Sequence, residues 1–221
     1  GVFGLIAYTV TRHGLAVLLP LGKLILTAFI ATLIFVCITY LPIIKLIGMK
    51  ISDYLKGAFE PWLIAFTTCS SAAALAVNLE ASRKMGASKA IASFAIPLGN
   101  TINMNGTSIY MGVTAVFAAE VFGIDLTLAQ QFQIVLMGVL AAVGTAGVPG
   151  AGLIMTTLVF TEVGIPLEAV ALIAGIDRIL DMIRTSVNVL GDSLTALVVS
   201  KSEGVLGTEL MDQDTVVKEQ F

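Results

Sequence analysis

Long apolar runs fill most of this 221-residue chain and decide what it can fold into. The cleanest run covers residues 24–48, and others cover 1–22, 91–122, 126–165 and 167–200. A helix needs about 20 mostly apolar residues to cross a bilayer. Only 12% of the residues are charged, against roughly 25% in a soluble domain. We therefore expect an all-α, polytopic membrane protein.

The same scarcity of charge excludes other classes of protein. Charged side chains normally cover the surface of a soluble globule, and too few are present here. A cytosolic enzyme and a secreted disulfide scaffold are excluded on this ground. The net charge of −3 argues further against a nucleic-acid partner, because such binding requires basic surface.

Polar interruptions within the apolar runs suggest irregular backbone at membrane depth. The motif TTCSSAAA interrupts residues 54–85, PLGNTINMNGTSIY interrupts 90–122, and GTAGVPGAG interrupts 128–164. Such backbone is tolerated only where protein surrounds it or where it lines a cavity. We expect two re-entrant helical hairpins (54–85 and 128–164), each followed by a helix, the first of these unwound. Repeats with matching interruptions indicate a secondary transporter.

The distribution of lysine and arginine predicts the orientation in the membrane. With the first joint outside, Arg12 and Lys23 are external. Eight basic residues then lie inside: Lys45, Lys50, Lys56, Arg83, Lys84, Lys89, Lys201 and Lys218. This count favours a cytoplasmic tail at 201–221. Trp62, Tyr40 and Tyr54 are expected to be interfacial anchors.

The run 167–200 carries charged residues that a membrane helix would normally avoid. An ionised side chain at the bilayer centre costs about 2.5–3.5 kcal/mol, so such residues suggest function. Five polar residues recur at intervals of 4, 3, 4 and 4: Asp177, Asp181, Arg184, Asn188 and Asp192. At about 100° per residue they occupy one helix face about 80° wide. Their arrangement suits a substrate with a carboxylate for Arg184 and an ammonium for Asp181.

Two other interpretations of this face are less consistent with the sequence. A purely structural ladder of Asp–Arg pairs would leave a surplus carboxylate and Asn188 unexplained. An intramembrane aspartyl protease also needs two buried carboxylates. Its Gly-x-Gly-Asp motif requires glycine at position 189, where this chain has Val189. A transporter, not an enzyme, is therefore expected, and a channel is the remaining alternative.

Four motifs together resemble the glutamate transporter family, also called dicarboxylate/amino acid:cation symporters. They are SSAAA, PLGNTINMNGT, GTAGVPGAG and DRILDMIRTSVNVLGD. The resemblance covers nearly all of residues 1–205 and implies the C-terminal half of a longer, homotrimeric protein. It assigns 1–22 to the end of a scaffold transmembrane helix. It assigns 23–200 to a transport domain with helix 24–48, the two hairpins, broken helix 90–122 and polar-faced helix 167–200.

The resemblance also implies the substrate site. Arg184 would bind the side-chain carboxylate of the substrate and Asp181 its amino group. The other substrate contacts implied are Asn188, Thr185, Thr107, Ser70, Ser71 and Val148.

Sodium ions are implied as co-substrates, and no cofactor is expected. One sodium site would use Gly99, Asn103, Asn188 and Asp192. A second would use Thr101, Met104, Ala142, Val143 and Thr145. The family pattern has aspartate where this chain has Asn105, which puts a third site in doubt. Proton-coupled members often have asparagine where Asp192 stands, so sodium is favoured here.

The expected function is sodium-coupled symport of aspartate or glutamate by alternating access in the cell membrane. A C4-dicarboxylate symporter and a proton-coupled acidic amino acid symporter are alternatives. A further possibility is that this fragment transports nothing alone.

Overall fold

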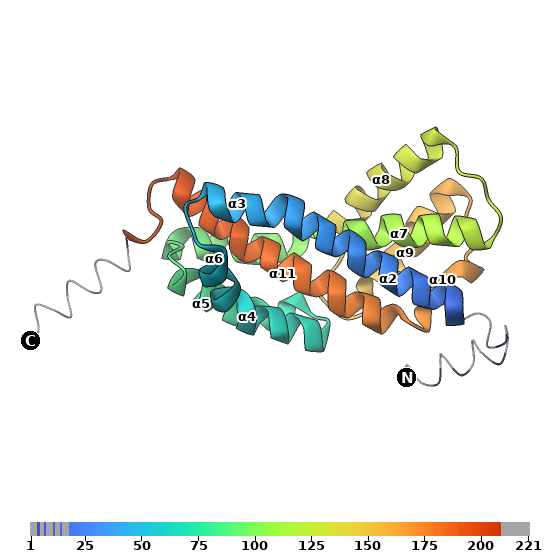
Figure 1. The fold of residues 1–221 in the computed structure, drawn as a ribbon, viewed down its shortest axis with the longest axis horizontal. Helices are drawn as coiled ribbons and strands as arrows, with labels where there is room; N and C mark the ends of the chain where they lie inside the picture. The colour runs from blue at the N-terminus through green and yellow to red at the C-terminus, as the bar shows by residue number, and fades with distance from the viewer. Residues whose placement is uncertain (1–3, 5–6, 8–10, 12–13, 15–17, 209–221) are drawn as a thin grey trace, which may run out of the picture.

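The structure is a computed structural model that describes residues 4, 7, 11, 14 and 18–208. Every regular element within 18–208 is helical (Figure 1). The elements are α2 (Leu18–Phe35), a π-helical segment (Val36–Tyr40), α3 (Leu41–Leu46), α4 (Ile51–Thr68), α5 (Ser71–Lys84), α6 (Lys89–Ile102), α7 (Asn105–Val121), α8 (Leu128–Val143), α9 (Ala151–Val163), α10 (Glu168–Ala174) and α11 (Asp177–Ser202). The expected helical class is confirmed for these residues. Arg12 and residues 209–221 lie outside the described part.

The first long helix runs without a break from Leu18 to Leu46. Its 29 residues, with a mean hydropathy of 2.5, are long and apolar enough to cross a membrane. It begins six residues before the predicted start at 24. Pro20 falls in the first turn, where proline removes no helical hydrogen bond. Lys23 is exposed, so the charge does not interrupt the helix.

Two pairs of adjacent helices correspond to the segments predicted as hairpins. Helices α4 and α5 pack together, and so do α8 and α9. Cys69, with φ of 56°, forms the left-handed turn of the first pair, and Ser70 caps α5 by accepting a hydrogen bond from Ala73 N. The pairs come from opposite ends of the elongated molecule (Figure 1). Their tips meet where Ser70 Oγ donates to Gly147 O at 2.8 Å.

The predicted break within 90–122 is present. Helix α6 ends at Ile102 and α7 begins at Asn105. Asn103 and Met104, between them, have ψ values of 63° and 50°, far from the helical value. The backbone is therefore unwound at the Asn-Met pair of the sequence motif.

The sequence predicted one continuous polar-faced helix over 167–200, and this prediction is wrong. The segment is divided into α10 and α11, with Gly175 and Ile176 between them. Ile176 has φ of −115° and ψ of 0°, and its N–H bonds to Ile173 O in a tighter turn. The polar series therefore starts on the first residue of α11, Asp177, rather than within a helix.

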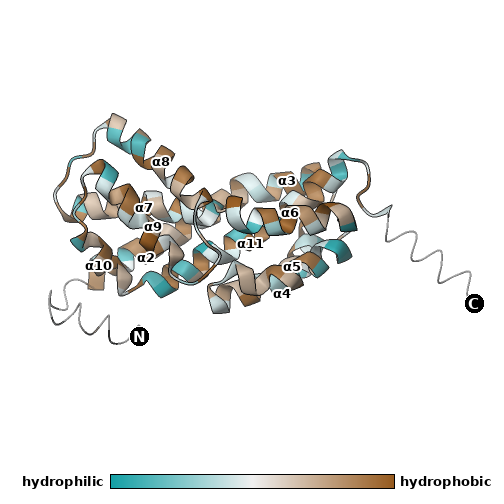
Figure 2. Ribbon diagram, turned by 180° about the vertical axis from the view of Figure 1, so that it is seen from behind, coloured by the Kyte–Doolittle hydropathy of each residue, from teal (hydrophilic) through white to brown (hydrophobic). Residues whose placement is uncertain are grey.

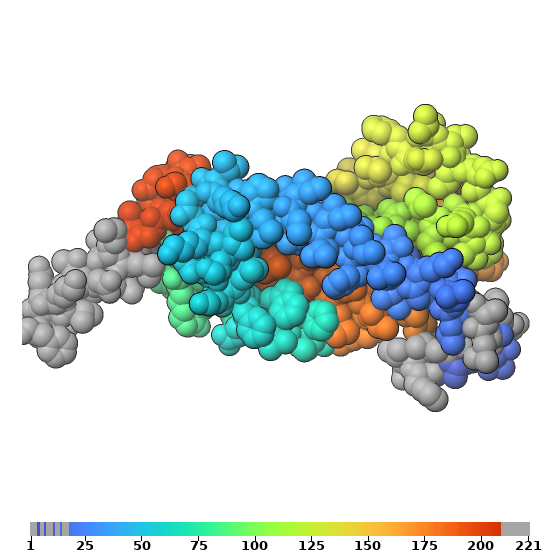
Figure 3. Space-filling view, viewed as in Figure 1, coloured from blue at the N-terminus to red at the C-terminus, as the bar shows by residue number. Residues whose placement is uncertain are grey.

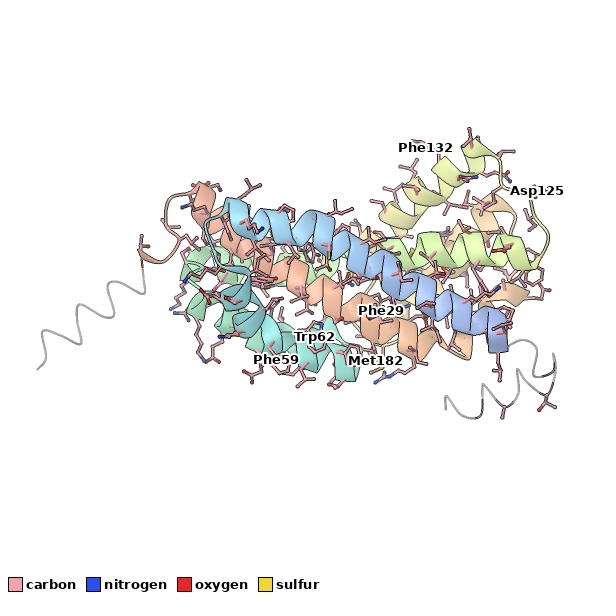
Figure 4. All side chains as sticks on the ribbon, viewed as in Figure 1. Phe29, Phe59, Trp62, Asp125, Phe132 and Met182 are labelled. Atoms are coloured by element: carbon pink, nitrogen blue, oxygen red, sulfur yellow. The ribbon has the colours of Figure 1, made fainter. Side chains whose placement is uncertain are left out.

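The outward surfaces are apolar, and many polar residues lie inside. Figure 2 shows hydrophobic residues along much of the length of the helices, and many large hydrophobic side chains are exposed. Phe29, Phe59 and Phe132, from α2, α4 and α8, are more than half exposed (Figure 4). The two larger apolar clusters of the core lie around α7, α9 and α10 and around α3, α6 and the second half of α11, and a small third one joins α4, α5 and α11. This distribution suits a chain surrounded by lipid.

The surface of the molecule carries a groove lined mostly by apolar residues. It lies between α2 and α7, has a volume of about 600 Å³ and carries Lys23 and Glu120 among apolar residues. In Figure 3 the surface is hollowed between α2 and the part formed by α8.

Several lysine residues lie at one end of the molecule, where Lys84 pairs with Glu80. Joints at one end carry Lys45, Lys50, Lys84 and Lys201, beside the ends of α3, α5 and α11. The joint between α7 and α8, at the other end, carries Asp125 (Figure 4).

Candidate functional site

All five polar residues of the predicted helix face are buried on α11. Asp177, Asp181, Arg184, Asn188 and Asp192 are between 1% and 6% exposed. Helices α4, α5, α6, α7 and α2 pack around α11 and cover them. The predicted common face is therefore confirmed, and it lies in the centre of the molecule.

Arg184 lies between two carboxylates and an aromatic ring. Its Nη1 donates to Asp177 Oδ1 at 2.9 Å, and its Nη2 lies 3.0 Å from Asp181 Oδ2. The Cζ atom is 4.2 Å from the ring centroid of Tyr110. A Cβ on Gly152 would come within 2.7 Å of Cζ, so this glycine makes room for the guanidinium. Nη2 donates no hydrogen bond within the described residues, which leaves it as a donor for a ligand.

Asp181 is held from three sides. Gly150 N donates to its Oδ2 at 2.8 Å and Thr185 Oγ1 to its Oδ1 at 2.7 Å, in addition to the ion pair with Arg184. Gly150 belongs to the tip between α8 and α9, so this carboxylate ties α11 to that tip.

Asn188 joins α11 to the unwound stretch. Its Oδ1 accepts from Gly106 N at 2.8 Å. Its Nδ2 donates to Thr107 Oγ1 at 3.0 Å and to Met104 Sδ at 3.1 Å. The predicted substrate residues Thr107 and Asn188 are therefore in direct contact.

A closed compartment collects most of the predicted substrate residues. It is lined by Ser71, Met104, Thr107, Thr145, Ala146, Gly147, Val148, Gly152, Asp181, Arg184, Thr185 and Asn188. Its free volume is about 10 Å³, roughly what a single water needs. Ser70 does not line it, but bonds to Gly147 O at its edge. A substrate of amino acid size therefore requires the tips to part.

Asp192 occupies a second polar region beyond Asn188. It accepts a hydrogen bond from Asn103 Nδ2 at 3.0 Å, and a Cβ on Gly99 would lie 2.6 Å from its Oδ1. Three members of the first predicted sodium set, Gly99, Asn103 and Asp192, are thus together. Within the described residues, Asp192 forms no ion pair.

Asn105 is not among the residues that line the substrate compartment. Its Nδ2 donates to Asn103 Oδ1 at 2.7 Å and to Tyr40 Oη at 3.1 Å, and Tyr40 Oη donates to Val187 O. Tyr40 is therefore buried against α11, at the end of the π-helical segment. Tyr54 is also buried, and donates to Leu190 O at 2.6 Å. The prediction that both tyrosines are interfacial anchors is wrong.

The second predicted sodium set is divided. Met104 and Thr145 line the closed compartment. Thr101 is exposed and bonds to Leu98 O. Ala142 is buried and Val143 exposed, both at the end of α8.

One residue at the site was not predicted to contact Arg184. Tyr110 stacks on the guanidinium and donates to Asp177 Oδ1 at 2.9 Å. It follows Thr107 by three residues, so helical spacing from the unwound stretch could have placed it on the same face. The pairing of Asp177 with Arg184 spans seven residues, or two turns, and is the contact expected from their common helix face.

The buried charges do not balance. Asp177 and Asp181 contact the guanidinium of Arg184, and Asp192 lies apart from it, so the three carboxylates and one guanidinium carry a net charge of −2 when all are ionised. Buried charge without a partner costs several kcal/mol per ion.

Comparison with known proteins assigns the chain to a family. The model of the sodium:dicarboxylate symporter family matches residues 1–202. The chain is 39% identical, over 95% of its length, to the proton/sodium-glutamate symport protein of Geobacillus stearothermophilus, and covers 50% of that protein. It is 38% identical over 92% of its length to the proton/glutamate-aspartate symporter of Escherichia coli, covering 46% of it.

A relative of another stated specificity is equally similar. The C4-dicarboxylate transport protein of Bacillus subtilis is 38% identical over 92% of this chain, which covers 48% of it. The chain thus spans about half the length of these relatives, all of which are named as transporters rather than enzymes. The chain belongs to the sodium:dicarboxylate symporter family.

Proposed function

We propose that the protein is a secondary active transporter that carries an acidic amino acid together with sodium ions by alternating access. The observation that supports this proposal best is the buried cluster of three carboxylates and one guanidinium on α11. Aspartate or glutamate adds a further net charge of −1. Entry of this substrate therefore requires co-bound cations, which is the physical basis of symport.

The substrate is recognised by opposite charges one turn apart. The Arg184 fork binds the side-chain carboxylate, and Asp181 binds the ammonium. Thr107, Thr185 and Asn188 orient the substrate from α7 and α11. The two tips close over it through Ser70, Ser71 and Val148.

Sodium ions neutralise Asp192, the carboxylate that does not pair with Arg184. Asp192 supplies the charge of the first site, together with oxygens of Gly99, Asn103 and Asn188. The second site uses oxygens of Thr101, Ala142, Val143 and Thr145 and the sulfur of Met104. Asn105 has an uncharged amide where the family pattern has a carboxylate, and this amide bonds to Asn103. A third sodium ion therefore binds weakly or not at all.

In the membrane, the helix pairs α4–α5 and α8–α9 are re-entrant hairpins of a transport domain covering 23–200. The lysine residues at one end of the molecule support a cytoplasmic C-terminus at that end. The protein works as a homotrimer in the cell membrane, with residues 1–22 in its scaffold.

A C4-dicarboxylate is the second candidate substrate. Asp181 already has Arg184, Gly150 N and Thr185 as partners, so its charge is partly compensated without a substrate ammonium. This reduces the repulsion that a dicarboxylate would meet.

Uptake by the complete natural polypeptide in liposomes tests the proposal. Radiolabelled aspartate, glutamate and malate are supplied with an inward sodium gradient, an inward proton gradient or neither. We expect aspartate or glutamate to accumulate with sodium alone. Accumulation with protons alone would contradict sodium coupling, and uptake of malate only would contradict the amino acid assignment.

A further inference from the structure

At the junction between the two helix-pair tips, some polar atoms form hydrogen bonds and others have no partner within the described residues. Two contacts hold the tips together. Gly147 O accepts from Ser70 Oγ at 2.8 Å and from Ala72 N at 3.2 Å. The backbone of the second tip is thus fixed directly to the N-terminus of α5.

Two further side chains, Ser71 and Asn100, lie close to Gly147. A Cβ built on Gly147 would contact Ser71 Oγ, and would lie 3.1 Å from both Nδ2 and Oδ1 of Asn100. Asn100 comes from α6, so three segments converge here: α5, α6 and the second tip. Only glycine fits at position 147 in this arrangement.

Ser71 Oγ and Asn100 Oδ1 are both buried and have no hydrogen-bond partner within the described residues. Ser71 is 2% exposed. A buried polar group that lost its water and gained no partner destabilises the conformation that buries it. Closing the tips buries these groups, so closure is less favourable than the two bonds to Gly147 O alone would make it.

We propose that Asn100 is a positioning residue that sets how readily the second tip opens. It acts through Gly147 rather than through the substrate, since it does not line the compartment around Arg184. Together with Ser71, it destabilises the closed junction, so that the tip opens when no substrate or cation holds it. This inference rests on the proposed function, because it assigns the tip a gating role.

Removing the amide should therefore favour closure. In Asn100→Ala the unpartnered group is absent, and we expect the open-to-closed ratio to fall about tenfold. Ser71→Ala should shift the ratio in the same direction. Phe94→Ala is the matched control, because Phe94 lies on the same helix with a 70% exposed side chain.

Distances between two spin labels measure this ratio. The labels are placed on the exposed positions Lys56 and Ala146, in the complete polypeptide with Cys37 and Cys69 replaced by serine. Without substrate, wild type should show open and closed populations, and Asn100→Ala mostly the closed one. An unchanged distribution, a shift towards open, or wild type with no detectable open population would each overturn the inference.

The same samples separate this inference from the proposed function. Aspartate with sodium should close the tip in wild type. If it does not, the gating role of the proposed function fails, whatever Asn100→Ala does. If it does, and Asn100→Ala matches Phe94→Ala, only the inference about Asn100 fails. A thermal unfolding measurement on each variant verifies that it is folded.

Discussion

Asp177 Oδ1 lies 2.9 Å from Arg184 Nη1, two helical turns later on α11, and accepts a second hydrogen bond from Tyr110 Oη. This carboxylate therefore fixes the direction of the guanidinium before any substrate arrives. Pre-organisation of this kind lowers the cost of binding.

Asp177→Asn should weaken aspartate binding without abolishing it. The amide keeps the size of the side chain but loses the charge that orients Arg184. We expect Kd to rise roughly tenfold, the equivalent of about 1.4 kcal/mol, just below the range of about 1.5–3 kcal/mol for charged hydrogen bonds. Isothermal titration at saturating sodium measures it. Tyr110→Phe should give a smaller rise, and the two effects should not add, because both act on one guanidinium. Additive effects would show that Asp177 acts elsewhere.

Arg184→Lys should remove most transport despite keeping the positive charge. Lysine offers no planar fork to a carboxylate and cannot stack on Tyr110 as a guanidinium does. Aspartate uptake should fall by about a hundredfold, the equivalent of about 2.7 kcal/mol. The measurement is initial uptake in liposomes, and wild-type rates in this variant would refute the assignment of Arg184.

Asp192→Asn should change the dependence on sodium more than the choice of substrate. The buried carboxylate accepts a hydrogen bond from Asn103 and forms no ion pair in the described part of the chain. Neutralising it removes the main attraction for a cation. We expect half-maximal uptake to need at least tenfold more sodium, with the aspartate-to-glutamate preference unchanged. An identical sodium curve would place the cation elsewhere.

Gly152→Ala should disrupt the site sterically. The added Cβ would approach Arg184 Cζ to 2.7 Å and push the guanidinium from its position. Aspartate affinity should fall at least tenfold, in line with the cost of overpacking, about 1–3 kcal/mol. Gly112→Ala is the matched control, because nothing lies within 4 Å of its Cβ position within α7. It should bind normally and unfold at an equal or higher temperature.

The sequence was sufficient for the helical class, the two paired segments and the polar face of α11, because each leaves a periodic pattern. Asp181, Arg184 and Asn188 fall on one face at any helical spacing near 3.6. The unwound pair Asn103–Met104 was also predictable, since polar residues interrupt an apolar run there.

Long-range contacts left no such pattern. Tyr40 and Tyr54 look like interfacial anchors, because tyrosine is common at membrane surfaces. Their hydroxyls instead reach carbonyls of Val187 and Leu190, more than 130 positions later. The approach of Asn100 to Gly147 likewise depends on the packing of α6 against α8. The break before Asp177 was missed because Gly175 alone does not end a helix.

The central claim is that cations balance the buried carboxylates when an acidic substrate binds, and sodium-dependent aspartate binding tests it most directly. Titrations of aspartate at a series of sodium concentrations, with choline keeping the ionic strength constant, give Kd against sodium. We predict that Kd falls by more than tenfold for each tenfold rise in sodium, because more than one cation binds with each aspartate. A Kd that does not change with sodium would contradict the account.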